Sequence, residues 1–224
     1  IANSVGTSTE DIATMSLHYL LQSSTTASDT LLDYIGTELG LQFEKDVHFE
    51  LQSCGENLER PDMSLRNSHN DEILIFEMKF WAALTDNQPN TYLERLKKKG
   101  GNGLVFVCPK SRIISLVDEL ATSANYEKHQ GRLLQKDGNP PMLVLSWEEV
   151  LTKLENILQG DTLYNDLLQL KGLTGEMDNQ DFKPFTAGDL NVNMANRIID
   201  YYRIVDKIAD SLLIHKICNS KGLK

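Results

Sequence analysis

The sequence predicts an α/β protein with a mixed central β-sheet that is flanked by helices. Short apolar runs rich in β-branched residues alternate with longer segments whose apolar residues recur at helical spacing. Clusters of glycine, proline and asparagine separate these segments, as expected at turns. No apolar run approaches the ~20 residues that a membrane-spanning helix needs, so we expect no membrane segment.

Helices are predicted where apolar residues recur every three to four positions. A helix over 28–39 is expected to end at Gly40, because glycine is typical just beyond a helix C-terminus. Ser146 is expected to cap a helix that begins at Trp147. The expected helices are 8–23, 28–39, 88–99, 112–122 and the segment from Trp147 onward.

Strands are predicted for short apolar or alternating runs. Residues 42–53 alternate, with Val47, Phe49 and Leu51 on one face. The run from Ile73 to Phe76 is apolar and half β-branched, which indicates a buried strand. The expected strands are 42–53, 61–66, 72–79, 104–107 and 142–145.

The length of 224 residues suits either one large domain or one domain with a helical extension. We expect the domain at residues 1–160 and the extension at 161–224. Between Met194 and Leu213 apolar residues form a wide helical stripe, which either packs on the domain or mediates oligomerisation or partner binding. Residues 124–141 are polar and predict a loop, either a solvated connection or a contact to nucleic acid.

The net charge, the cysteines and the N-terminal residues make some classes of function less expected than others. The formal net charge of −10 argues against an indiscriminate DNA binder, because such proteins usually present a basic face. Cys54, Cys108 and Cys218 have no paired spacing, which predicts neither a disulfide framework nor a zinc site and favours a reducing, cytoplasmic setting. The N-terminus lacks a basic region followed by an apolar core, so we expect no secretory signal.

The most informative residues are Pro61-Asp62 and, fifteen positions after Asp62, Glu77-Met78-Lys79. On a strand, Glu77 and Lys79 share one face, and antiparallel pairing of the two strands would bring Asp62 beside Glu77. Asp62, Glu77 and the Met78 carbonyl then offer the hard oxygen ligands that Mg²⁺ prefers, and Lys79 would orient the nucleophile. The alternative is structural: a turn aspartate and an exposed Glu77–Lys79 pair.

Together with Gln88 and Tyr92, these residues resemble the PD-(D/E)XK nuclease superfamily, and the Gln-x-x-x-Tyr spacing resembles its RecB-like branch. The resemblance covers about residues 8–158 in motif order and implies a restriction-endonuclease-like fold. It implies a Mg²⁺-dependent deoxyribonuclease, with Mn²⁺ as a substitute, that serves in phage defence. Gln88 and Tyr92 lie on one helix face, and the resemblance directs them to the catalytic site and the DNA.

The resemblance also suggests more distant site residues. Family members often carry an acidic residue on the first helix, so Glu10 is the candidate additional metal ligand and Glu38 its alternative. Glu10 equally fits a first-turn acid that stabilises the helix dipole. Arg95, Lys98 and Lys99 are candidate contacts to DNA phosphates, and the same run fits an ordinary helix C-terminus.

A function of another class also fits the composition. A catalytically silent module of restriction-like fold would bind protein partners through its acidic surface and its C-terminal helices. Homodimerisation through those helices is a related alternative. The intact motif favours the nuclease, because a silent site need not keep all three motif residues. The sequence leaves open endo- or exonucleolytic cutting, specificity, DNA or RNA, and the number of metal ions.

Overall fold

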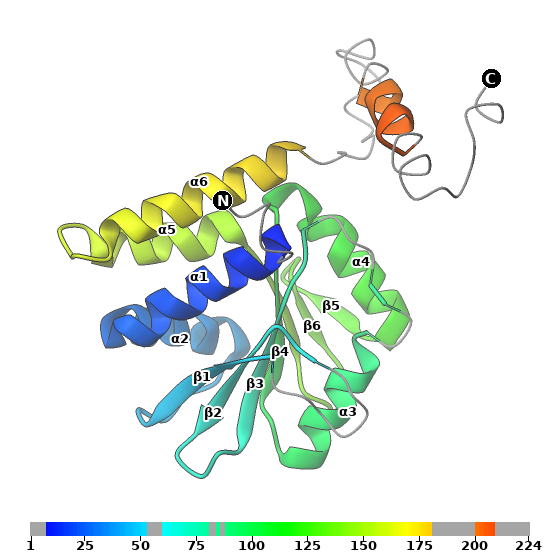
Figure 1. Cartoon of the computed structure of the whole chain (residues 1–224). Coiled ribbons are helices and arrows are strands. Elements are labelled where there is room, and N and C mark those ends of the chain that lie inside the picture. The colour runs from blue at the N-terminus through cyan, green and yellow to red at the C-terminus, as the bar shows by residue number, and fades with distance from the viewer. Residues whose placement is uncertain (1–7, 53–59, 81–83, 86–87, 181–199, 209–224) are drawn as a thin grey trace. The chain divides into compact units, whose positions relative to one another are not determined.

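The structured body of the chain is a seven-stranded β-sheet with helices on both faces (Figure 1). The sheet and its helices belong to a compact unit formed by residues 1–179, and a second unit comprises residues 180–224. This confirms the predicted fold class, an α/β protein with a mixed sheet and a helical C-terminal part. The computed structural model describes residues 8–52, 60–80, 84–85, 88–180 and 200–208.

The helices begin and end close to the predicted positions. Ser8 caps the first helix in a reciprocal pair of hydrogen bonds with Asp11, and Ser146 forms the same motif with Glu149, which confirms the predicted N-cap. Gly40 ends the second helix with a φ of 68°. The helical elements are α1 (Thr9–Ser23), α2 (Thr25–Leu39), α3 (Asn90–Lys99), η2 (Lys110–Arg112), α4 (Ile113–Ala124), α5 (Trp147–Leu158) and α6 (Tyr164–Gln180).

The strands form one sheet in the order β1-β2-β3-β4-β7-β6-β5. The central strands β3, β4 and β7 run parallel, and the pairings at both edges are antiparallel. The carboxyl ends of the three parallel strands β3, β4 and β7 therefore meet at one edge of the sheet. The strands are β1 (Val47–Leu51), β2 (Met63–Asn67), β3 (Glu72–Met78), β4 (Gly103–Cys108), β5 (Glu127–His129), β6 (Leu133–Gln135) and β7 (Met142–Ser146).

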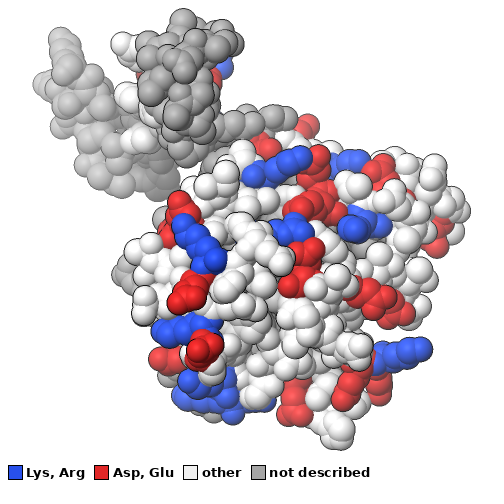
Figure 2. All heavy atoms as spheres, turned by 180° about the vertical axis from the view of Figure 1, so that it is seen from behind, with Lys and Arg blue, Asp and Glu red and all other residues white. Residues whose placement is uncertain are grey.

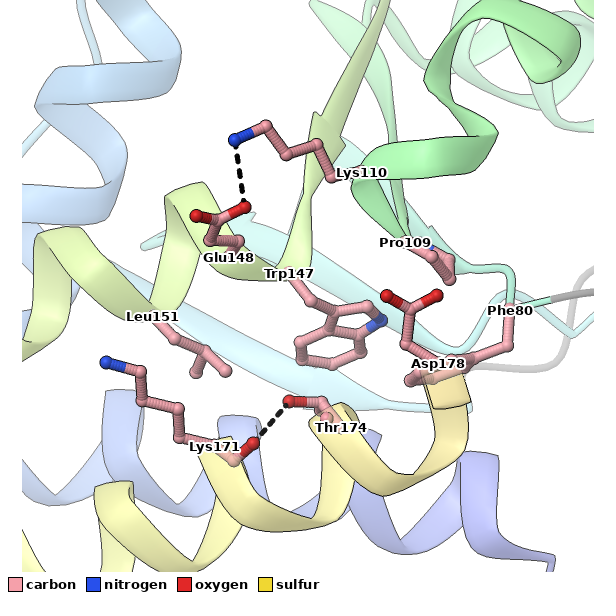
Figure 3. Close-up of a pocket in the computed structure, with 10 residues that line it drawn as sticks. Phe80, Pro109, Lys110, Trp147, Glu148, Leu151, Lys171, Thr174 and Asp178 are labelled. Carbon is pink, nitrogen blue, oxygen red and sulfur yellow. Dashed lines mark hydrogen bonds and ion pairs between the residues drawn. The ribbon is translucent and has the colours of Figure 1, made fainter. Parts of the chain in front are cut away.

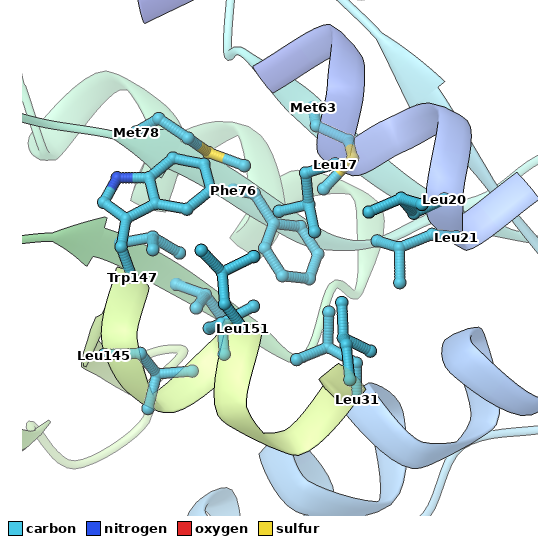
Figure 4. Close-up of a cluster of buried hydrophobic side chains, with 14 of the residues drawn as sticks. Leu17, Leu20, Leu21, Leu31, Met63, Phe76, Met78, Leu145, Trp147 and Leu151 are labelled. Carbon is cyan, nitrogen blue, oxygen red and sulfur yellow. The ribbon is translucent and has the colours of Figure 1, made fainter. Parts of the chain in front are cut away.

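Two apolar layers hold the helices on the sheet. Helices α1, α2, α5 and α6 pack on one face against Phe76 and Met78 of β3, while α3 and α4 pack on the other face against Ile75. Figure 4 shows Phe76 and Met78 among side chains from α1 and α5. Because strand side chains alternate, Glu77 points to the same face as Ile75, which is the α3 face.

The pairing of β2 with β3 is the antiparallel one predicted. Met63 lies opposite Phe76. Asp62, the residue before β2, therefore comes level with Glu77 near the end of β3. The predicted proximity of these two residues follows from that register.

The prediction of a loop over 124–141 is wrong for part of that segment. The segment contains β5 and β6, which pair antiparallel at the edge of the sheet. All three side chains of β5 are exposed, and only Leu133 and Leu134 of β6 are buried. Two three-residue strands with so few apolar positions lack the alternation by which a strand is recognised in sequence.

The first compact unit reaches residue 179, beyond the predicted domain end at 160. It includes α6, because Leu167 and Leu170 of that helix join the core shared by α1, α2 and α5. The predicted stripe from Met194 to Leu213 lies mostly outside the described residues. Within it, residues 200–208 are helical.

Two further observations bear on the sequence expectations. In the part of the chain that the structure describes, no helix is long and apolar enough to cross a bilayer. Cys108 is buried and carries a free thiol. Cys54 and Cys218 lie outside the described residues.

Candidate active site

The end of β3 brings two carboxylates to its backbone. β2 begins at Met63, which lies opposite Phe76 of β3. The N–H groups of Met78 and Phe80 lie beyond that point, so β2 provides no backbone carbonyl for them. The Met78 N–H donates to Asp62 Oδ2 at 2.7 Å, and the Phe80 N–H donates to Glu10 Oε1 at 3.0 Å. The backbone thereby gathers Asp62 and Glu10 at one end of the strand.

Glu77 lies on the α3 face of the same strand end and is 4% exposed. Its Oε1 accepts a hydrogen bond from Gln88 Nε2 at 2.8 Å and pairs with Lys79 Nζ at 2.9 Å. Its other oxygen, Oε2, is buried and has no hydrogen-bond partner. Leaving a buried acceptor unsatisfied costs about 1–3 kcal/mol, so this oxygen is a position where a ligand or ion would be stabilising.

Gln88 and Tyr92 connect α3 to the segment that carries Asp62. Gln88 Nε2 donates to the Tyr92 hydroxyl at 3.1 Å, and that hydroxyl donates to the Arg60 carbonyl at 3.2 Å. Gln88 lies in the turn just before α3 rather than within the helix. The two side chains nevertheless meet as predicted. They hold Glu77 and the backbone before Asp62 in one network.

The charges of this cluster are not balanced. Burial, and then the neighbouring Glu77 carboxylate, raise the pKa of Asp62 to about 7, although the Met78 N–H and Lys79 act in the opposite direction. Burial and Glu77 also raise the pKa of the Tyr92 hydroxyl, which therefore remains a neutral hydrogen-bond donor. The buried Glu77 carboxylate and the half-buried Asp62 carboxylate, with the single Lys79 ammonium, have a deficit of positive charge that a cation would relieve.

The donor set fits a hard divalent cation. Asp62 and Glu77 supply carboxylate oxygens, and the N–H and carbonyl of Met78 both lie on the strand edge that faces Asp62. One or two carboxylates completed by water and phosphate oxygens are typical for Mg²⁺. Among the described residues, no three His, Cys, Asp or Glu side chains form a complete metal site by themselves. The Glu77 oxygen without a partner is the observation that supports a metal here.

Glu10 and Glu38 have different surroundings. Glu10 lies in the first turn of α1 and reaches across to Phe80, so its carboxylate belongs to the same strand end as Asp62. Glu38, the alternative acid, pairs with Arg132 at 2.8 Å. The Glu38 carboxylate is bound to Arg132 and not to the cluster, so Glu38 is no longer a candidate metal ligand.

Arg95 occupies a structural position that argues against the expected contact with DNA. It is 6% exposed, and its guanidinium makes two hydrogen bonds of 2.6 Å to the Glu72 carboxylate. Glu72, which is 1% exposed, also accepts from the Ser64 hydroxyl at 2.7 Å. A guanidinium held in such a buried bidentate pair has no exposed face for a phosphate.

Lys98 and Lys99 are exposed in the last turn of α3, and Gly100 follows with a φ of 71°. This is the predicted helix C-terminus. The ten residues of α3 carry this end about 15 Å from the carboxylate cluster. The two lysines are free to meet a distant phosphate of a long substrate, and they do not belong to the cluster itself.

Arg112, which the sequence offers with Lys110 only as a local basic candidate, is a positioning residue in the structure. It is buried and donates to the Phe80 carbonyl at 2.6 Å. The backbone of Phe80 is therefore held on both sides, by Arg112 at its carbonyl and by Glu10 at its N–H. No local motif marks such a contact, because the residues are far apart along the chain.

The described part of the face in Figure 2 offers little net attraction for a polyanion. Figure 2 shows lysines and arginines interspersed with aspartates and glutamates over the described residues of one face, without a broad basic area.

Comparisons with protein-family models, with curated proteins and with solved structures find no match to this chain. The functional inference therefore depends on the residue motif and on the geometry of the cluster.

Proposed function

We propose that this chain is a metal-dependent deoxyribonuclease of the PD-(D/E)XK superfamily. The observation that carries the proposal is the buried Glu77 carboxylate, which lies beside Asp62, pairs with Lys79 and keeps one oxygen without a partner. A structural ion pair between Glu77 and Lys79 would not need a second carboxylate beside it, because Asp62 raises the cost of burying the Glu77 charge. A site that holds a cation does need it.

Each residue of the cluster has a defined part in this reaction. Asp62, Glu77 and the Met78 carbonyl would hold Mg²⁺ or Mn²⁺. The bound ion supplies polarisation of the scissile phosphate and a water of lowered pKa. Lys79 would orient the attacking water and offset the charge that develops on the phosphate. Gln88 fixes the rotamer of Glu77 through its 2.8 Å hydrogen bond.

Other parts of the chain have supporting functions in this proposal. Glu10 positions the backbone beyond Lys79 and would add a further carboxylate ligand for the metal. Tyr92 ties α3 to the Arg60 carbonyl. Lys98 and Lys99 are proposed contacts to DNA phosphates. We propose defence against foreign DNA as the biological role, on the motif resemblance alone.

The test is cleavage of supercoiled and linear DNA with Mg²⁺, with Mn²⁺ and with EDTA. Native protein should cut only with metal, and Lys79→Ala should lose at least about 10²-fold in rate. Lys45→Ala is the matched control, because Lys45 is exposed before β1, at the opposite end of that strand from the cluster. Folded native protein that cuts under no condition, or a Lys79→Ala variant that cuts as the native chain does, contradicts the proposal.

A second function is supported by the helical residues 200–208. Tyr202, Val205 and Ile208 are all more than half exposed and recur every three residues along this segment. Such a stripe suits a partner helix or a second copy of the chain. Sedimentation of native protein and of Val205→Asp tests this: an assembly that the substitution dissociates supports a binding function, and a native monomer contradicts self-association.

A further inference from the structure

A pocket of about 270 Å³ lies at the carboxyl ends of the parallel strands (Figure 3). Phe80, Pro109 and Trp147 line it just after the ends of β3, β4 and β7, and Thr174 and Asp178 of α6 line the opposite side. In α/β proteins, ligands bind at this edge of the sheet. Sites for drug-sized ligands span roughly 300–1,000 Å³, so this pocket accommodates a single ring system.

Two polar atoms of this pocket's lining are buried without a hydrogen-bond partner. They are the indole Nε1 of Trp147 and Oδ1 of Asp178. Trp147 is 3% exposed, and both residues line the pocket. Figure 3 shows the indole nitrogen edge on the side of the ring where the Asp178 carboxylate lies. A donor and an acceptor are thus left unsatisfied within one small site, at about 1–3 kcal/mol each.

The side chains that line the pocket restrict the chemical class of ligand that it can bind. Phe80 and Trp147 form a stacked aromatic wall, with ring centroids 5.6 Å apart and ring planes inclined by 22°. Such a wall favours a flat apolar body. A hydrocarbon would leave both polar atoms unpaired, a simple cation would satisfy only Asp178, and a simple anion would satisfy only Trp147. A planar ring with a donor beside an acceptor satisfies both, and a nucleobase is such a ring.

We propose that this pocket binds one unpaired nucleobase of the nucleic acid whose phosphate lies at the carboxylate cluster. The choice of a nucleic acid rests on the proposed function. The pocket and the cluster are linked through Phe80, which lines the pocket, follows Lys79, and has its N–H held by Glu10. Taking a base out of a duplex costs a few kcal/mol, so mismatched, terminal or single-stranded positions are preferred for cutting.

Access requires only a local adjustment. Both polar atoms are closed to water in this structure. Asp178 lies two residues before the end of α6. The last turn of a helix frays more readily than its centre, so a small shift of this turn admits the edge of an entering ring. At the rim, Lys110 is exposed and paired with Glu148 at 3.1 Å, and a phosphate attached to that base would reach Lys110 by displacing the Glu148 carboxylate.

The test is the fluorescence of Trp147 in the full chain. Trp81, the other tryptophan, lies outside the described residues and is replaced by phenylalanine, so that Trp147 alone reports. The probes are the four uncharged deoxynucleosides, which need no metal. We expect saturable quenching, weakened about tenfold by Asp178→Ala, which corresponds to about 1.4 kcal/mol. Glu176→Ala, an exposed acid on the same helix, is the matched control and should bind as the parent does.

A second variant removes the donor. Trp147→Phe keeps an aromatic ring and loses the N–H, and calorimetry should show a comparable weakening of nucleoside binding. Absence of nucleoside binding, or equal binding by the native chain and Asp178→Ala, overturns the inference. Quenching by methylguanidinium or by inorganic phosphate, without quenching by nucleosides, also overturns it in favour of a simple ion site.

The pocket inference and the proposed nuclease function are refuted by different results. Lys79→Ala should bind nucleosides as the native chain does while losing cleavage. DNA cleavage without nucleoside binding would refute the pocket inference alone. Nucleoside binding without metal-dependent cleavage would refute the proposed function and leave the pocket as a base-binding site.

Discussion

Replacing Arg95 with alanine should strongly destabilise the fold. Arg95 and Glu72 are both buried and joined by two hydrogen bonds of 2.6 Å. Removing the guanidinium leaves an uncompensated carboxylate in the α3 layer, and such losses cost about 3–5 kcal/mol. Ser64 still donates to Glu72, and Arg66 lies 3.7 Å from it, so the lower end of that range applies. We expect a loss of about 3 kcal/mol.

The assay is urea denaturation followed by circular dichroism, with the free energy of unfolding extrapolated to water. Lys98→Ala is the matched control, because it removes an exposed cation from the same helix and should change stability by less than about 0.5 kcal/mol. The double variant Glu72→Leu with Arg95→Met should recover most of the loss, because an apolar pair leaves no buried charge. An Arg95→Ala protein as stable as native, with weaker DNA binding, would refute a structural role for Arg95.

Three further outcomes follow from the same geometry. Burial alone would raise the pKa of Glu72, but hydrogen bonds from Arg95 and Ser64 outweigh it and lower the pKa. Its contribution is therefore present above the ordinary carboxyl pKa of 4.5 and lost as pH falls below it; acid titration of stability should be shallower in Glu72→Gln. Gln88→Ala removes one of the two partners of Glu77 Oε1, leaving only Lys79, and should weaken Mn²⁺ binding about 10- to 100-fold in calorimetry. Lys98→Ala with Lys99→Ala should lower the slope of log K for DNA against log salt by about 2, and an unchanged slope would remove both as phosphate contacts.

The sequence predicts those parts of the structure that depend on local patterns. The apolar run from Ile73 to Phe76 predicts β3, and the placement of Asp62 beside Glu77 follows from one antiparallel pairing. Ser146 predicts its cap because its partner lies three residues away. In each case the decisive contact is short in sequence or repeats with the period of the element.

Contacts between residues far apart in the chain leave no local pattern in the sequence. The lysine run after Arg95 predicts a surface cation, because nothing local indicates that Glu72 contacts the Arg95 guanidinium across the α3 layer. Glu10 reaches Phe80 over 70 positions, and the motif suggested a metal ligand without indicating that backbone contact. The Trp147–Asp178 pocket arises only when α6 packs near the carboxyl end of β7. Such pairings depend on topology, which local periodicity does not determine.

Parallel measurement of Mn²⁺ binding and DNA cleavage on three proteins tests the central claim most directly. Native protein should bind the ion and cut. Lys79→Ala should bind the ion and fail to cut, because the lysine acts on the water and the phosphate rather than as a ligand. Glu77→Gln should lose both, because it removes a carboxylate ligand. Cutting in EDTA, or cutting by Glu77→Gln at the native rate, would contradict a metal-dependent site at this cluster.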